Sequence, residues 1–198
     1  MRESLFSLVG LGLCACLLTA CASTPSHDQI QASFDAGLKA YDAGDFKTAY
    51  HVWDDIGDYD LAALRNVALM LREGQGVDKD AKAALAKMAR AADLGLVTAQ
   101  ADVGEMLING EGAPADKAAA VPWLARAAEV GHPIAAFELA QIYEEGKAVP
   151  QDLKQARRLY EIAAGAGMLE AAERLKALDG AVSARPAATQ GPLPPTAP

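Results

Sequence analysis

The 198-residue chain is 52% hydrophobic, which provides enough apolar side chains for one domain with a buried core. Its formal net charge is −8, so the chain lacks the excess of basic residues that a nucleic-acid-binding surface needs. We therefore expect no nucleic-acid partner.

Residues 1–20 have the features of an export signal. Arg2 gives a weakly positive start, and an apolar run then extends to Ala20, shorter than the ~20 apolar residues that span a bilayer. The run ends in Leu18-Thr19-Ala20-Cys21, which resembles a bacterial lipobox. The resemblance implies cleavage before Cys21 and attachment of acyl chains to its sulfur and amino group. The alternative is an ordinary signal peptide, which would leave Cys21 as a free thiol.

The other cysteines are consistent with lipidation. Cys14 and Cys16 lie inside the signal, so the mature chain would have Cys21 alone and no internal disulfide. Several acyl chains would hold the protein on a membrane of the bacterial cell envelope, facing the periplasm. Under the sorting rule known for such lipoproteins, Ala22 in place of aspartate favours the outer membrane.

Residues 21–28 are small and polar and predict a tether between the lipid and the fold. Residues 29–62 predict a degenerate capping unit of two amphipathic helices, separated at Gly44. Trp53 lies on the apolar stripe of the second helix, where we expect it to be a core residue. Terminal units of a repeat array are expected to be atypical because they cap the stack.

A pattern with a period of 36 residues dominates the rest of the chain. A period in this range is typical of a solenoid, whose units bury their apolar faces against their neighbours. The columns that repeat include Ala63, Ala99, Ala135 and Ala171, and also Gly95, Gly131 and Gly167. We expect full units at 63–98, 99–134 and 135–170, a C-terminal capping helix over 171–179, and a disordered Pro/Ala-rich tail over 180–198.

Each full unit is predicted to contain two helices. Glycine at a helix C-terminus takes the left-handed conformation at little cost, and aspartate before a helix accepts backbone N–H bonds. Pro122 lies inside the second helix of the middle unit, where we expect a kink or a late helix start. The terminating glycines are Gly74, Gly110 and Gly146, and the capping aspartates are Asp80, Asp116 and Asp152.

These residues resemble the Sel-1-like repeat, a member of the tetratricopeptide superfamily. The resemblance implies an all-α fold, a right-handed α-solenoid of helix–turn–helix units, and a protein-binding function. The column of Trp123 holds Lys87 and Leu159 in the other units, so packing there should be looser. In the middle unit the matching residues are Gly110-Glu-Gly112, Asp116, Ala120, Trp123, Arg126-Ala127-Ala128 and Gly131-His132.

The sequence contains no recognisable catalytic or metal-binding pattern. Its histidines, His27, His51 and His132, do not share metal-ligand spacing. The Gly-x-Gly sequences do not follow a strand, so turn geometry explains them better than phosphate binding does. We expect no enzyme activity and no cofactor beyond the lipid on Cys21.

In tetratricopeptide-type solenoids the first helix of each unit lines a groove. The helical pattern predicts a protein-binding groove whose residues mix apolar and charged side chains. The alternative is that the apolar members only pack between units. The predicted groove residues are Arg65, Leu69, Arg72, Ala101, Glu105, Ile108, Phe137, Gln141 and Glu144.

The function we expect is that of a lipid-anchored scaffold or adaptor that binds other envelope proteins. One alternative is a module that binds the peptidoglycan cell wall. A less favoured one is a β-lactamase-like hydrolase, because the related proteins linked to β-lactams have a disulfide in each repeat and this chain has none.

Overall fold

The computed structural model describes residues 24–184, and their side chains as far as residue 180. The predicted signal 1–20, Cys21 and residues 185–198 lie outside this part. No helix within 24–184 combines the length and the apolar character needed to cross a membrane. The described part is entirely helical outside its turns, with helices α1 (His27–Asp42), α2 (Phe46–Ile56), α3 (Leu61–Glu73), α4 (Ala81–Asp93), α5 (Val97–Asn109), α6 (Lys117–Glu129), α7 (Pro133–Glu145), α8 (Leu153–Gly165) and α9 (Leu169–Ala184).

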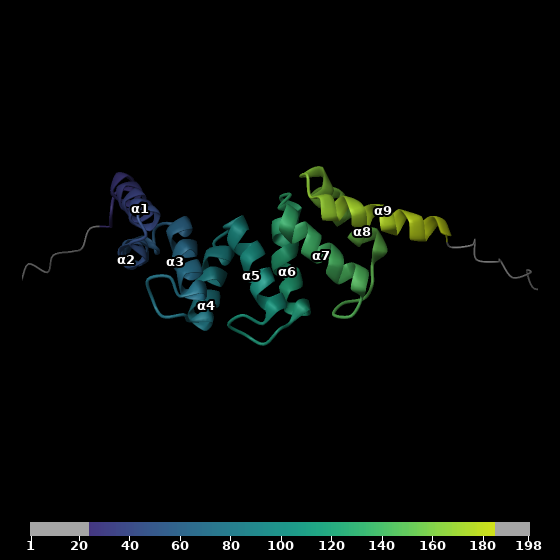
Figure 1. Cartoon of the computed structure of the whole chain (residues 1–198), viewed down its shortest axis with the longest axis horizontal. Helices are drawn as coiled ribbons and strands as arrows, with labels where there is room; N and C mark the ends of the chain where they lie inside the picture. Colours follow the sequence, from purple (N-terminus) through teal and green to yellow (C-terminus); the bar gives the residue numbers. More distant parts are fainter. Residues whose placement is uncertain (1–23, 185–198) are drawn as a thin grey trace, which may run out of the picture.

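The helices pack in sequential pairs, which confirms the predicted all-helical repeat fold. α1 packs on α2, α3 on α4, α5 on α6 and α7 on α8, and each second helix also contacts the first helix of the next pair. α9 packs on α8 and ends the array. Figure 1 shows the pairs following one another along a curved array, with α1 and α9 at opposite ends.

Three boundaries differ from the sequence prediction. The expected tether extends to Asp28, but α1 already begins at His27, because Ser26 and Gln29 form a capping box (Gln29 N–H to Ser26 Oγ, 3.3 Å; Ser26 N–H to Gln29 Oε1, 2.8 Å). The helical units begin two residues earlier than the alanine columns suggested. α9 also starts earlier and continues through 180–184, the beginning of the tail that was predicted to be disordered.

The predicted helix ends are confirmed. The C-terminal glycines of α3, α5 and α7 have φ values of 77°, 73° and 64°, in the left-handed region. Asp80, Asp116 and Asp152 accept backbone N–H bonds at the starts of α4, α6 and α8. The late start expected near Pro122 is wrong, because α6 runs without interruption from Lys117. Pro122 has no backbone N–H to donate to the carbonyl of Ala118. Because Ala118 is exposed, water can donate to this carbonyl instead.

The core depends on a small residue in each first helix that faces a large one in the second. Gly104 of α5 lies directly against Leu124 of α6, where a Cβ at position 104 would overlap the leucine side chain. Met88 and Tyr160 occupy the positions of Leu124 in the units before and after, opposite Ala68 and Ala140. All four are 0% exposed, as is Leu124. The paired helices can therefore approach closely only if this column stays small.

Trp53 is a core residue, as the sequence predicted. It is 2% exposed, and its indole N–H donates to the Phe34 carbonyl of α1 at 3.2 Å. The first pair thus buries its largest side chain between its own two helices.

We predict that Gly104→Ala destabilises the fold by about 1–3 kcal/mol, because the added Cβ would overlap the fully buried Leu124 side chain, which would have to shift within the core. Urea denaturation measures this effect. The matched control is Gly165→Ala at the end of α8, where a Cβ meets nothing within 4 Å and stability should stay the same or rise. Equal destabilisation by both substitutions would contradict the packing argument.

Candidate functional site

The predicted groove residues lie on one face of the array, formed by the first helices α3, α5 and α7 and continued by α9. We call it the first-helix face. Polar contacts connect α3 to α5 on this face, and Arg174 of α9 lies 3.6 Å from Glu144 of α7. Arg65 of α3 forms an ion pair with Asp102 of α5, with Nε and Oδ2 2.5 Å apart and both side chains mostly buried.

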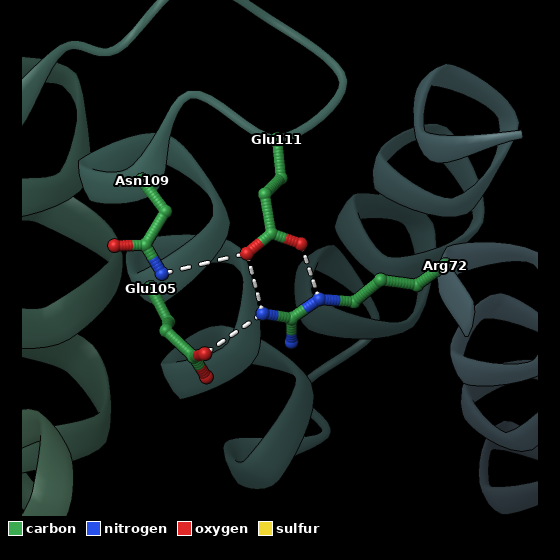
Figure 2. Close-up of polar contacts among 4 residues, drawn as sticks. All are labelled: Arg72, Glu105, Asn109 and Glu111. Atoms are coloured by element: carbon green, nitrogen blue, oxygen red, sulfur yellow. Dashed lines mark hydrogen bonds and ion pairs between the residues drawn. The ribbon is translucent and has the colours of Figure 1, made fainter.

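A second ion-pair cluster joins α3 to α5 and to the loop that follows α5 (Figure 2). Arg72 donates to Glu111 through both Nε and Nη2, the latter at 2.7 Å from Oε1. The same Nη2 donates to Glu105 at 2.8 Å, and Asn109 supports Glu111 at 3.4 Å. A guanidinium that is held by two carboxylates in this way is geometrically fixed.

The cluster alters the acid–base properties of its members. Hydrogen bonding to Glu111 raises the pKa of Arg72 above its usual range, and the same bond lowers the pKa of Glu111. The charges of Arg72 and Glu105 are thus already compensated within the molecule. These predicted groove residues connect repeats and are less available to a partner than the sequence suggested.

The apolar members of the predicted set are also partly engaged in packing. Ala101 is 6% exposed and belongs to the C-terminal core cluster. Leu69, Ile108 and Phe137 are half-buried against the two core clusters. Phe137 packs against Tyr160 of the same unit in a tilted arrangement, with ring centroids 5.6 Å apart. Packing inside the array therefore covers part of each of these side chains, and the rest is exposed on the first-helix face.

The first-helix face is hollowed between α7 and α9. A groove of about 420 Å³ lies there, and it brings together two predicted residues with residues of the terminal helix. Glu144, the third predicted residue of α7, accepts a 2.6 Å hydrogen bond from the Tyr160 hydroxyl, and burial followed by this bond raises the pKa of Tyr160. The groove is lined by Phe137, Gln141, Glu170, Glu173, Arg174 and Ala177.

Glu138 is the electrostatic anomaly of this face. Its Oε2 atom is buried and has no hydrogen-bond partner among the described residues. Burial, together with the carboxylates of Glu105 and Asp102 on α5, raises the pKa of Glu138 to about 7. Arg65 and Arg72 pair with those two carboxylates, and no lysine or arginine of residues 24–184 forms an ion pair with Glu138.

Sequence reasoning missed Asp102, Glu111, Glu138 and the contribution of α9. Asp102 and Glu138 directly follow the predicted positions Ala101 and Phe137, so a wider inner stripe on each helix would have included them. Glu111 lies in a loop, which helical periodicity does not cover. In the described part of the chain, no group of three or more His, Cys, Asp and Glu side chains is arranged to hold a metal ion.

We predict that Glu138→Gln stabilises the protein by about 1–2 kcal/mol at pH 8 and much less at pH 5. The value at pH 8 is already reduced for solvent screening of this partly exposed side chain. A carboxyl whose pKa is raised on folding favours the native state below its unfolded pKa, and this contribution is lost as the pH rises towards 7. The uncharged amide does not titrate.

Urea denaturation of both proteins at the two pH values measures the difference. The exposed Glu173→Gln of α9 serves as the matched control. A stability difference between Glu138→Gln and wild type that does not change with pH would contradict the proposed burial of this carboxyl.

Comparisons with known proteins agree with this architecture. A family model described as Sel1 repeat matches residues 61–96, 97–132 and 133–168, which begin at the first residues of α3, α5 and α7. The crystal structure of a Sel1 repeat protein from Oxalobacter formigenes is similar, with a TM-score of 0.65 and 30% identity over 72% of this chain and 58% of that one.

A protective antigen present in uropathogenic Escherichia coli strains, which displays an SLR fold, has a TM-score of 0.49 and 22% identity over 79% of this chain and 42% of that one. The chain therefore spans less than two thirds of the length of either solved structure. No curated protein matches the sequence. Because the family model covers more than half of its residues, the chain belongs to the Sel1 repeat family.

Proposed function

We propose that this Sel1 repeat protein is a lipid-anchored scaffold that binds other proteins of the bacterial envelope through its first-helix face. The observation that carries the proposal is the groove between α7 and α9, a hollow of about 420 Å³ with Phe137 in its wall and acidic side chains around it. A groove that combines an aromatic contact with charged residues suits a polypeptide ligand.

The charge of this region indicates the kind of partner. Glu170 and Glu173 are exposed and form no ion pair with other described residues, while Arg174 is 3.6 Å from Glu144. Glu138, with a raised pKa, lies nearby and its Oε2 atom has no hydrogen-bond partner among the described residues. The face between α5 and α9 is therefore net acidic and complements a segment that presents lysine or arginine beside an apolar side chain.

The N-terminal half of the predicted groove has a different role in this proposal. Arg65, Arg72 and Glu105 hold α3 and α5 together through ion pairs, so they keep the face in shape. The partner is expected to contact α7 and α9 first. This assigns a scaffold role to the repeat array as a whole, with no catalytic step.

The lipid anchor is the second part of the proposal. The lipobox-like Leu18-Thr19-Ala20-Cys21 supports acylation of Cys21 and attachment to the outer membrane, on its periplasmic side. An anchor of this kind would confine the scaffold to the membrane surface, where its partners would be other envelope proteins.

Site-specific photo-crosslinking in cells tests the binding face. A crosslinker at Gln141 or at Glu173 should trap the same envelope protein, because both positions line the groove. The matched control is Lys82, an exposed residue of α4, a second helix. Equal capture from Lys82, or different proteins from Gln141 and Glu173, would contradict a binding site on the first-helix face.

Metabolic labelling with an alkyne fatty acid tests the anchor. The wild-type protein should be labelled, and Cys21→Ser should lose the label and leave the membrane fraction. Cys16→Ser is the control and should remain labelled, because position 16 lies within the removed signal. Label retained by Cys21→Ser, or absent from wild type, would show that this cysteine is not the acylation site.

A further inference from the structure

A second hollow lies on the opposite side of the array, between the second helices α6 and α8, with α7 as its floor. Its volume is about 380 Å³. Apolar side chains of α6, α7 and α8 line its interior, and the polar groups of Glu129, Gln155 and Arg158 contribute at least as much of its exposed surface. It is lined by Ala125, Ala128, Glu129, Leu139, Tyr143, Gln155, Arg158, Leu159 and Ile162.

The preceding unit shows which side chain fills the equivalent space beside its own second helix. One unit earlier, the position of Leu159 is occupied by Trp123, which packs against the N-terminal core cluster. The members of that cluster include Ala92 and Val103, with Ala89 and Leu107 at its margin. Shifted by the 36-residue period, these four residues become Ala128, Leu139, Ala125 and Tyr143, all of which line the hollow.

The three full units have different side chains at the repeat position of Leu159. In the first full unit Lys87 takes the position and forms a 2.8 Å ion pair with Asp54 of α2. In the second, the Trp123 ring packs inward and Arg126 covers it, with the guanidinium carbon 4.4 Å from the ring centre. In the third, Leu159 is 9% exposed and belongs to the core, and the hollow remains open beside it.

We propose that the hollow between α6 and α8 is a docking site for an aromatic side chain presented by a partner polypeptide. The incoming ring would take the place that the Trp123 indole takes one unit earlier, against Ala128 and Leu139. Arg158, which lines the edge of the hollow, can lie over the ring, although it stands at a different repeat position from Arg126, whose place is taken by Ile162 in this unit. Gln155 and Glu129 offer hydrogen bonds to the backbone of the segment that carries the ring.

Residues 185–198 cannot supply this ring, because they contain no aromatic residue. Among the exposed large hydrophobic residues of the described part, the aromatic one is Tyr59, at 51% exposure in the turn between α2 and α3. A second copy could present Tyr59, and the test below treats that case separately. The site is distinct from the first-helix face and does not depend on it.

The test uses NMR of the full chain titrated with N-acetyl-tryptophanamide, with N-acetyl-leucinamide as the matched probe. The aromatic probe should shift signals of the residues that line the hollow, with a dissociation constant on the order of 1 mM, because a single side chain supplies all the contacts. The leucine probe should bind at least tenfold more weakly.

Leu159→Trp should fill the hollow from within and weaken probe binding at least tenfold. Leu159→Met, which keeps the side-chain volume, should leave binding unchanged. Ala125→Leu narrows the hollow from α6 and gives an independent block if Leu159→Trp fails to fold. Circular dichroism and the thermal midpoint confirm that each variant is folded.

Three results would overturn the proposal. The first is the absence of shifts at the lining residues, and the second is shifts that persist in both folded blocking variants. The third is a wild-type dimer in which the hollow is protected, when Tyr59→Ser abolishes both the dimer and the protection; this result would assign the site to a second copy.

Discussion

Close approach of paired helices is the constraint on which the rest of this structure depends. Gly104 lies against Leu124, and alanines hold the matching positions opposite Met88 and Tyr160. Small residues on the first helix let a large, fully buried side chain of the second helix fill the space between the two helices in each full unit. Because the same column returns every 36 residues, the pairs stack with the same offset and the array extends without a single central core.

Regular stacking produces two surfaces with different chemistry. On the first-helix face, Arg65 and Arg72 connect α3 to α5 through carboxylates, and Arg174 of α9 lies 3.6 Å from Glu144 of α7. Between these contacts, Glu138 of α7 faces the carboxylates of α5 and forms no ion pair with another described residue, and its pKa is raised. On the second-helix face, the column of Trp123 loses its indole at Leu159 and leaves a hollow. On both faces the unit formed by α7 and α8 therefore differs from the unit before it.

These departures from the repeat pattern place both candidate binding sites on α6 to α9. A repeat array satisfies its polar and apolar groups mainly through neighbouring units, so a unit that departs from the pattern leaves groups available to another molecule. The acidic groove between α7 and α9 suits a basic segment, whereas the hollow between α6 and α8 suits an aromatic side chain. The two sites lie on opposite faces, so one partner or two could occupy them.

Local patterns in the sequence were enough to predict the helices, their capping residues and the Sel1 repeat family, because caps and seams depend on residue types at fixed spacing. The sequence also suggested an inner face and a looser Trp123 column. It could not show that Arg72 is held by Glu105 and Glu111, that Glu138 Oε2 is buried without a hydrogen-bond partner among the described residues, or that a hollow opens beside Leu159. Those features depend on distances between side chains of different units, and only the packing of the helices in three dimensions sets them.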